Sequence, residues 1–328
     1  MLERLRQPWS DRRAELTLGA ASLLIGAIVI AMVAFVFVQA WPIFEHDGLG
    51  WLGPGGHGLE HQIEAMQAAG PKPVASSYHL NAWPIVYATL VTTVASVALG
   101  LVLAVLSSIF IVELAPARLR RITVPVIRLL ASVPSVVYGL IGILVLVPFV
   151  GNHIVSPAEK TSLQNTVPLT GASIGVAILI LTVMITPIMV ALTCEALVSV
   201  PNSWREGAIA LGVNPVRAIL AVTLRAARPA IVAAAVLATA RALGEAVMIS
   251  MVSGGKFFSP RPGDGFTFLF EPVRTLASTI VDFHEGIGAP AVKSTLYAFA
   301  AVLLFSAFML SVCGYLIRLP LRKYQVRG

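Results

Sequence analysis

Charged side chains are scarce in this sequence. Only 12% of its 328 residues are Asp, Glu, Lys or Arg, whereas 57% are hydrophobic. A soluble domain typically carries about 25% charged residues, so this chain lacks the side chains that cover a soluble surface. Its two cysteines, Cys194 and Cys313, lie in apolar runs and are too few for a disulfide framework. The composition therefore excludes a soluble enzyme and indicates an integral membrane protein.

Sequence motifs for several kinds of chemistry are also absent. No Gly-x-x-x-x-Gly-Lys-Ser/Thr pattern occurs, so the chain has no phosphate-cradling loop with which to hydrolyse ATP alone. The six histidines fall outside the apolar runs and have no metal-ligand spacing. No Ser/His/Asp or paired-carboxylate arrangement is found. We therefore expect a protein without catalytic residues, without a metal and without a cofactor of its own.

Long apolar runs are abundant, and a membrane-spanning helix needs about 20 such residues. Six runs are found, at about 16–40, 83–114, 122–150, 171–194, 229–252 and 291–317. The first is too long for the hydrophobic part of a cleavable signal peptide, so we expect it to be retained as an anchor helix. The pattern predicts an all-α membrane protein with about six transmembrane helices.

The runs divide the chain into predicted segments. These are a cytoplasmic N-terminus at 1–15, a first transmembrane helix at 16–40, an external loop at 42–82, a core of five transmembrane helices at 83–317 with a cytoplasmic loop at 195–228, and a cytoplasmic tail at 318–328. We expect the external loop at 42–82, together with the segment 253–290, to face the outside.

Basic residues predict which side of the membrane each segment occupies. The N-terminus, the second and fourth connections and the tail contain fifteen Lys and Arg residues, whereas the other three connections and their edges contain six. Basic residues concentrate on the cytoplasmic side, so we expect both termini in the cytoplasm. The net charge of +7 is interpreted as a topology signal, and no nucleic acid partner is expected.

The cytoplasmic loop between the fourth and fifth runs carries helix-end signals. Ser203 followed by Glu206 fits a capping box, which predicts the start of a short helix. Gly212 suits the left-handed residue that ends a helix. Asn214 and Pro215 suit the cap and first turn of a second helix. On local physics alone, an ordinary ordered loop remains the alternative.

The same loop resembles the EAA loop of ATP-binding-cassette (ABC) importer permeases. It has Glu206-Gly207-Ala208 and then, after three residues, Gly212. It departs from the family pattern at Gly207, which replaces Ala, and at Arg225, which replaces Pro. In that family the loop is a coupling helix seated in a groove of a separate ATPase subunit, which binds ATP and Mg. The resemblance implies that coupling to the ATPase involves Ser203, Glu206, Gly207, Ala208 and Gly212.

Three further segments resemble PstC-type permease subunits of phosphate ABC importers, within the binding-protein-dependent transport inner membrane component family. They are Ser132-Val-Pro-Ser-Val-Val-Tyr-Gly139, Ala226-Ala-Arg-Pro229 with Arg241-Ala-Leu-Gly-Glu245, and Pro272-Val-Arg-Thr-Leu-Ala-Ser-Thr-Ile280. The resemblance covers about 84–317. It implies a type I ABC importer permease fold in a bacterial cytoplasmic membrane. It also implies a PstA-like second permease as heterodimer partner, two PstB-like ATPase subunits and an external PstS-like phosphate-binding protein.

Arg241 and Glu245 are charged residues well inside the fifth apolar run. A charge near the centre of a spanning helix costs about 2.5–3.5 kcal/mol, so it seldom occurs without a partner. Their spacing of four predicts one helix face, where the two side chains can form a structural pair. The other hypothesis is that Arg241 contacts a translocated anion, because its planar fork of donors matches phosphate oxygens, while Glu245 holds it between substrates.

Hydroxyl groups in the third run offer further candidate contacts for an anion. Pro134 frees a backbone carbonyl there and predicts a kink or an interruption of the helix. Ser132, Ser135 and Tyr138 surround it and can donate hydroxyl hydrogen bonds to an oxyanion. Helix packing is an equally good interpretation of these three hydroxyls.

Together these patterns predict the permease of an ATP-driven phosphate importer. Three alternatives stay open from the sequence. The same kind of machine can carry another oxyanion or a small solute, an ion-coupled secondary transporter needs no ATPase, and a structural membrane subunit transports nothing. The loop around Glu206 argues against the second alternative, and the charge of Arg241 inside an apolar run argues against the third.

Overall fold

The computed structural model describes residues 9–53, 59–156 and 169–321, and within these ranges its regular structure is helical apart from one isolated bridge. Six helical segments are long and apolar enough to cross a membrane, namely Ala14–Asp47, Ala75–Leu114, Ser135–Ile154, Ile174–Val198, Pro215–Leu243 and Pro290–Ile317. The predicted all-α architecture with about six spans is confirmed. Most of the predicted N-terminal segment 1–15 and of the tail 318–328 lies outside the described residues.

The elements follow one another as helices (α) and short 3-10 or π segments (η). The N-terminal part contains α1 (Trp9–Asp47), η2 (Gly48–Leu52), α2 (Leu59–Ala68), η3 (Ala75–Tyr78), α3 (Trp83–Ile109) and η4 (Phe110–Leu114). The middle contains α4 (Ala117–Ser132), α5 (Ser135–Ile141), η5 (Gly142–Leu146), α6 (Val147–Phe149), η6 (Val150–Ile154), α8 (Ile174–Val198) and α9 (Asn202–Ala210). The C-terminal part contains α10 (Pro215–Ala218), η7 (Ile219–Thr223), α11 (Leu224–Leu243), α12 (Val247–Val252), η8 (Pro262–Phe270), α13 (Leu276–Asp282), η9 (His284–Gly288) and α14 (Pro290–Leu321).

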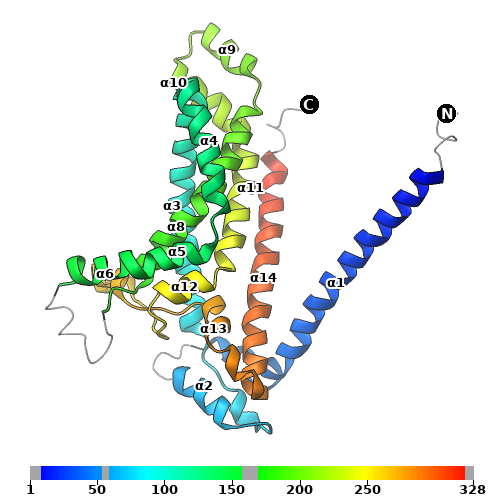
Figure 1. Ribbon diagram of the computed structural model, residues 1–328, viewed down its shortest axis with the longest axis vertical. Helices are drawn as coiled ribbons and strands as arrows, with labels where there is room; N and C mark the ends of the chain where they lie inside the picture. Colours follow the sequence, from blue (N-terminus) through cyan, green and yellow to red (C-terminus); the bar gives the residue numbers. More distant parts are fainter. Residues whose placement is uncertain (1–8, 54–58, 157–168, 322–328) are drawn as a thin grey trace.

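Helix α8 forms the centre of the bundle, where it packs against α3, α4 and α11 (Figure 1). Small and hydroxyl residues let α3 approach it closely, as is typical of helix pairs in membranes. A Cβ on Gly100 of α3 would lie 2.6 Å from Met189 Cε. Ser96 and Ser108 of α3 donate hydrogen bonds of 3.1 and 3.2 Å to backbone carbonyls of α8. Polar contacts therefore fix the register of this pair.

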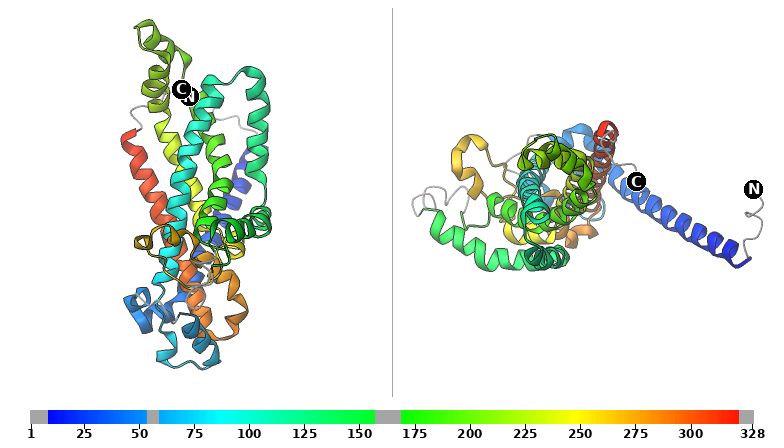
Figure 2. Two further views of the ribbon diagram at one scale, coloured as in Figure 1. Left: turned by 90° about the vertical axis from the view of Figure 1, so that its left-hand side faces the viewer. Right: turned by 90° about the horizontal axis from the view of Figure 1, so that it is seen from above.

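The third apolar run is interrupted rather than continuous. Helix α4 ends at Ser132 and α5 begins at Ser135, with Val133 and Pro134 in extended conformations between them. The helical segment from α5 to η6 then runs across the direction of α4 (Figures 1 and 2). The proline explains the break, because its ring blocks the helical conformation of the preceding residue and removes a donor.

The fifth apolar run is also interrupted. Helix α11 ends at Leu243, and α12 begins at Val247 after a short non-helical stretch. Helix α12 packs against α5, so the two interruptions are neighbours in space. A Cβ on Gly139 of α5 would lie 2.8 Å from the sulfur of Met251 and 3.2 Å from the Cα of Met248. This close contact between two half-helices positions the candidate site.

The two ends of the molecule are built differently. At one end α9 projects beyond the bundle, on the same side as the start of α1 and the end of α14 (Figure 1). At the other end, η2, α2 and η3 pack against α14 around a buried cluster that includes Trp51, Ile63 and Phe299. The predicted external loop 42–82 is thus largely folded. Helix α1 packs against α14 and diverges from the bundle toward its N-terminal end (Figures 1 and 2).

Candidate functional site

Arg241 and Glu245 lie on either side of the end of α11. The side chain of Arg241, in the last helical turn, is exposed on this chain. Glu245 lies beyond the helix end and is 9% exposed, and its Oε1 accepts a hydrogen bond of 3.2 Å from the backbone N–H of Met248. The predicted pairing of the two on one helix face is wrong, because the helix ends between them and Glu245 caps the start of α12.

The guanidinium of Arg241 forms no ion pair with any carboxylate in the described part of the chain. Arg241 and the predicted site residue Tyr138 lie in the same region of the bundle, because α12, which follows Arg241, packs against α5. They come from the two interrupted spans, one on α11 and the other on α5. The arrangement is a fixed cation beside two broken helices, a geometry that membrane proteins tolerate where backbone is covered by protein or lines a cavity.

The three candidate hydroxyls have different surroundings. The Tyr138 hydroxyl donates a hydrogen bond of 3.0 Å to the backbone carbonyl of Leu130. In a continuous helix this carbonyl would accept the N–H of residue 134, but Pro134 has no N–H. Ser132 donates to the carbonyl of Leu129 at 2.8 Å. Ser135, at the first turn of α5, is half-buried. In this conformation the Tyr138 and Ser132 hydroxyls therefore donate to their own span rather than toward a ligand.

The cytoplasmic loop begins its helix earlier than predicted. Helix α9 starts at Asn202 after Pro201, and no side chain caps it. The predicted capping box is wrong, because Ser203 already lies inside the first turn, where it cannot accept the cap hydrogen bonds. Ser203 and Glu206 are both exposed.

The end of α9 and the start of α10 follow the predicted geometry. Gly212 has a φ of +87°, in the left-handed region. Its N–H donates to the carbonyl of Ile209 at 2.9 Å, and the N–H of Val213 donates to the carbonyl of Ala208 at 3.1 Å. This is the double hydrogen bond of a Schellman motif. Asn214 Oδ1 then accepts from the N–H of Val216 at 2.9 Å. From Pro215 the chain is helical through η7 to the end of α11.

An ion pair between Arg205 and Glu113 anchors α9 to the bundle. Glu113 belongs to η4 at the end of α3, and its side chain is 4% exposed. This pair was not predicted from the sequence. A signal was available, because an acidic residue inside the end of an apolar run needs a basic partner.

The outer face of α9 carries apolar side chains. No residue of α9 is buried, Trp204 is 43% exposed, and Leu211, which follows the helix, is 87% exposed. Large exposed apolar side chains on a short projecting helix are typical of an interaction site. The anchored α9 therefore presents an apolar surface at the end of the bundle that is predicted to face the cytoplasm.

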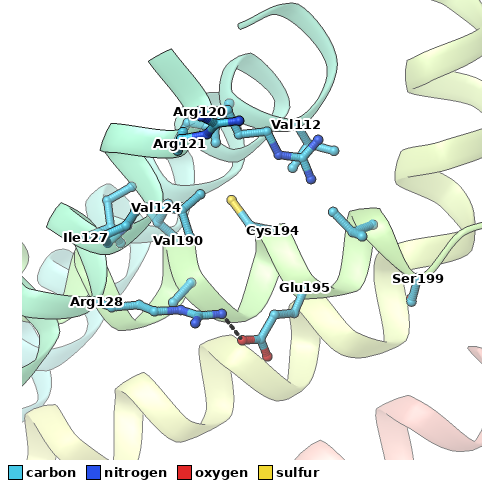
Figure 3. Close-up of a pocket in the computed structure, with 14 residues that line it drawn as sticks. Val112, Arg120, Arg121, Val124, Ile127, Arg128, Val190, Cys194, Glu195 and Ser199 are labelled. Carbon is cyan, nitrogen blue, oxygen red and sulfur yellow. Dashed lines mark hydrogen bonds and ion pairs between the residues drawn. The ribbon is translucent and has the colours of Figure 1, made fainter. Parts of the chain in front are cut away.

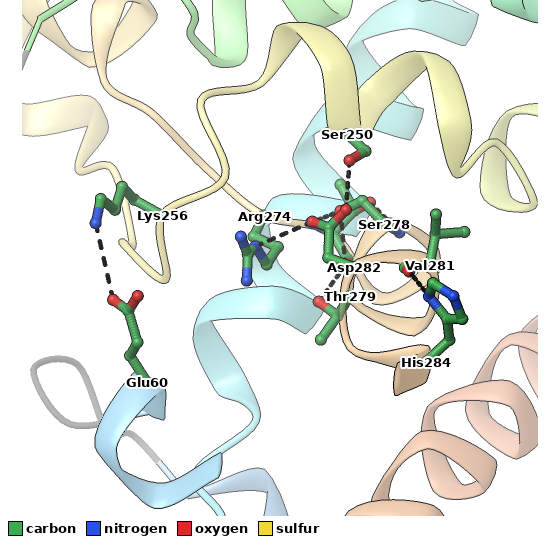
Figure 4. A network of polar contacts seen from close by, with 10 residues as sticks. Glu60, Ser250, Lys256, Arg274, Ser278, Thr279, Val281, Asp282 and His284 are labelled. Carbon is green, nitrogen blue, oxygen red and sulfur yellow. Dashed lines mark hydrogen bonds and ion pairs between the residues drawn. The ribbon is translucent and has the colours of Figure 1, made fainter. Parts of the chain in front are cut away.

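The segment Pro272–Ile280 lies at the opposite end and contains Arg274. The guanidinium carbon of Arg274 lies 4.7 Å from the ring centre of Phe257 and 5.0 Å from that of Phe283. Its Nε lies 3.5 Å from Asp282 Oδ2 (Figure 4). Burial lowers the pKa of the Arg274 guanidinium from its usual value, and the carboxylates of Asp282 and Glu60 act in the opposite direction.

Further contacts extend this external cluster, as Figure 4 shows. Ser250 of α12 donates to Asp282 Oδ1, and Lys256 lies 3.8 Å from Glu60 of α2. The cluster therefore joins α12, α13 and α2. Because Glu245 also bonds the first turn of α12, contacts run from the loops predicted to be external to the break beside Arg241.

Comparisons with known proteins agree with this architecture. The sequence model of one family, described as "Binding-protein-dependent transport system inner membrane component", matches residues 96–319. A Bacillus subtilis protein described as a probable ABC transporter permease, YqgH, is 30% identical over 90% of this chain and 87% of its own. A Methanocaldococcus jannaschii protein described as a probable phosphate transport system permease, PstC, is 28% identical over 90% of this chain and 89% of its own.

Among solved structures, the MetNI methionine ABC transporter in an inward-facing conformation matches with a TM-score of 0.51. The sequence identity is 19%, and the match covers 72% of this chain and 93% of that chain. At this identity the match supports the fold alone, and it confirms the predicted ABC importer permease fold.

Proposed function

Because the chain belongs to the family of binding-protein-dependent transport system inner membrane components, we propose that it is a PstC-type permease of an inorganic phosphate importer. Family membership makes it the permease component of an ABC importer. It is thus a multi-pass inner-membrane protein that is not itself catalytic and that works with ATPase and binding-protein partners. The substrate is the part that we propose.

The observation that supports phosphate as the substrate is the environment of the Arg241 guanidinium. It lies at the end of a half-helix, has no carboxylate partner among the described residues, and is exposed on this chain. A planar guanidinium binds the oxygens of phosphate in a bidentate manner and stays charged at physiological pH. Glu245 acts indirectly, since its cap on α12 fixes the chain that follows Arg241.

The hydroxyls of the other interrupted span supplement this contact. Tyr138 and Ser132 donate within their own span here, and Ser135 is half-buried at the start of α5. In the transport cycle, α5 and α12 move relative to α4 and α11, and the Tyr138 hydroxyl exchanges its carbonyl acceptor for the anion. Alternating access by movement of helix groups about a central site is the general mechanism for such proteins.

The partners proposed are those of a Pst system. A PstA-like permease covers the face that exposes Arg241, two PstB-like ATPases bind ATP and Mg and receive α9, and a PstS-like protein delivers phosphate. Support for the ATPase contact comes from the exposed Trp204 and Leu211 and from the anchoring of α9 by Arg205. The residues proposed to couple the permease to the ATPase are Ser203, Glu206, Gly207, Ala208 and Gly212.

A permease for another oxyanion or a small solute is the second candidate, because the relative YqgH is described as an ABC transporter permease without a substrate. The test is reconstitution of the chain with its neighbouring permease, ATPase and binding protein in proteoliposomes. We expect ATP-dependent uptake of labelled phosphate and little uptake of labelled sulfate. Equal uptake of the two anions, or of sulfate alone, contradicts phosphate specificity.

A further inference from the structure

A groove of about 590 Å³ lies between α4 and α8 (Figure 3). The end of α8 that lines it leads to α9, which projects from the same side of the molecule (Figure 1). This groove is called the α4–α8 groove below. Its walls are made by apolar side chains such as Val124 and Ile127 of α4 and Val190 of α8. The sulfur of Cys194 points from α8 toward it (Figure 3).

Positive charge collects at one end of the α4–α8 groove. Arg120 and Arg121, in the first turns of α4, line it together with Arg128 farther along the same helix. Arg128 lies 3.4 Å from Glu195, which is the only carboxylate among the lining residues (Figure 3). Arg120 and Arg121 form no ion pair with any carboxylate in the described ranges. The groove thus has two uncompensated guanidinium groups and a long apolar wall.

This combination selects an amphipathic anion. A free hydrated phosphate gains nothing from apolar walls, because burying a charge beside them costs free energy. A phospholipid satisfies both parts, since guanidinium groups bind its phosphate and apolar side chains contact its acyl chain. Basic pockets between spanning helices on the cytoplasmic side are the usual sites for anionic headgroups.

We propose that the α4–α8 groove binds an anionic phospholipid of the inner leaflet. Its phosphate contacts Arg120 and Arg121, and one acyl chain lies along Val124 and Ile127. Helix α4 has no buried residue and packs mainly on α8, so the lipid adds the contact surface that this helix lacks. Because α4 leads directly into the break at Pro134, the lipid also steadies one wall of the substrate site.

The test uses the full chain, purified in mild detergent and analysed by native mass spectrometry with added phosphatidylglycerol or phosphatidylcholine. The double variant Arg120→Gln/Arg121→Gln is compared with Arg118→Gln/Arg225→Gln, which removes two exposed arginines that do not line the groove. We expect phosphatidylglycerol affinity to fall about fivefold for each groove arginine removed, as about 1 kcal/mol per basic residue predicts. The control variant and Arg120→Lys/Arg121→Lys keep most of the binding.

Two further measurements locate the lipid and identify its source. Cys194 is buried, so the probe is a cysteine placed at Val198, which lines the groove and is 55% exposed, in a background without Cys194 and Cys313. Phosphatidylglycerol should slow its alkylation, whereas phosphatidylcholine and millimolar inorganic phosphate should not. Equal lipid retention by all variants, or equal retention of the two lipids, overturns the proposal. Displacement of the lipid by inorganic phosphate also overturns it, because the groove then binds the free anion. Repeating the comparison with the second permease present tests occupancy by that subunit, and loss of lipid from the wild-type complex contradicts the proposal.

Discussion

Arg241 and Glu245 are four residues apart, yet the end of α11 at Leu243 separates them and Glu245 bonds the N–H of Met248 instead. The consequence is a cation without an acidic partner among the described residues at the centre of an apolar run. Glu245, which follows this cation in the chain, bonds the first turn of α12. Ser250 of α12 in turn donates to Asp282, which pairs with Arg274. The site is therefore linked to the outer loops through one short helix.

The first prediction concerns the ion pair of Arg205 with Glu113, which we expect to anchor α9 to the bundle. Glu113→Gln leaves the guanidinium without its charged acceptor, which costs about 1.5–3 kcal/mol for a hydrogen bond to a charged group. We expect faster limited proteolysis of the loop 195–228 in inside-out vesicles. The control is Glu195→Gln, whose pair with Arg128 is more than half exposed and contributes about 0–1 kcal/mol. Identical digestion rates for the two variants contradict the anchoring role.

Coupling to the ATPase is tested at Glu206, which is exposed on α9. The charge reversal Glu206→Lys should reduce ATPase co-purification or abolish ATP-driven uptake, while membrane insertion stays normal. Glu15→Lys is the matched control, because Glu15 is an exposed acid predicted on the same side and distant in sequence from α9. Wild-type association and uptake in the Glu206 variant argue against the coupling role.

Topology is tested by cysteine labelling in a background without Cys194 and Cys313. A cysteine at Gly263, in η8, is expected to react with an impermeant thiol reagent added to intact cells. A cysteine at Asn214, the cap of α10, is expected to react only after the membrane is opened. Labelling of the Asn214 position in intact cells reverses the predicted orientation.

Another prediction concerns the role of Arg274 in the response to the binding protein. In Arg274→Gln the buried guanidinium between Phe257 and Phe283 is lost, so α13 and the loop after α12 lose their common contact. We expect weaker stimulation of ATP hydrolysis by the binding protein in proteoliposomes. Lys256→Gln serves as the control, because its contact with Glu60 is half exposed and at 3.8 Å. Normal stimulation of the Arg274 variant indicates that the cluster does not transmit the docking signal.

Features that depend on local sequence could be predicted, and features that depend on distant contacts could not. Length and hydropathy predict six spans, Pro134 predicts the interruption of the third run, and Gly212 predicts the left-handed turn. No sequence signal predicted the interruption of the fifth run. The ion pair of Arg205 and Glu113 joins residues 92 positions apart, so no local pattern specifies it.

The two wrong predictions share one cause. The interpretations of Ser203 with Glu206 and of Arg241 with Glu245 both assumed where a helix begins or ends. Helix ends are decided by a few hydrogen bonds and by packing, and they are the least predictable feature of a sequence. Helix α9 begins one or two residues before its predicted start, so Ser203 lies inside it. Helix α11 ends at Leu243, nine residues before the predicted end of its run at 252, so Glu245 lies outside it.

The last prediction concerns the substrate path and uses the separation of Arg241 from Glu245. Because the two side chains do not pair here, neutralising both is not equivalent to removing a balanced pair. If Arg241 binds phosphate, Arg241→Gln should abolish uptake in an assembled transporter, and adding Glu245→Gln should not restore it. Arg241→Lys should keep partial uptake, since it retains the charge and loses the bidentate fork. Glu245→Gln alone should be milder, because its amide oxygen can still accept the N–H of Met248, whereas Glu245→Leu loses that cap at a cost of about 1 kcal/mol. Assembly is checked by co-purification of all subunits, and uptake by labelled phosphate. Robust uptake by the assembled Arg241→Gln/Glu245→Gln variant would show that Arg241 has a structural role and that phosphate passes without it.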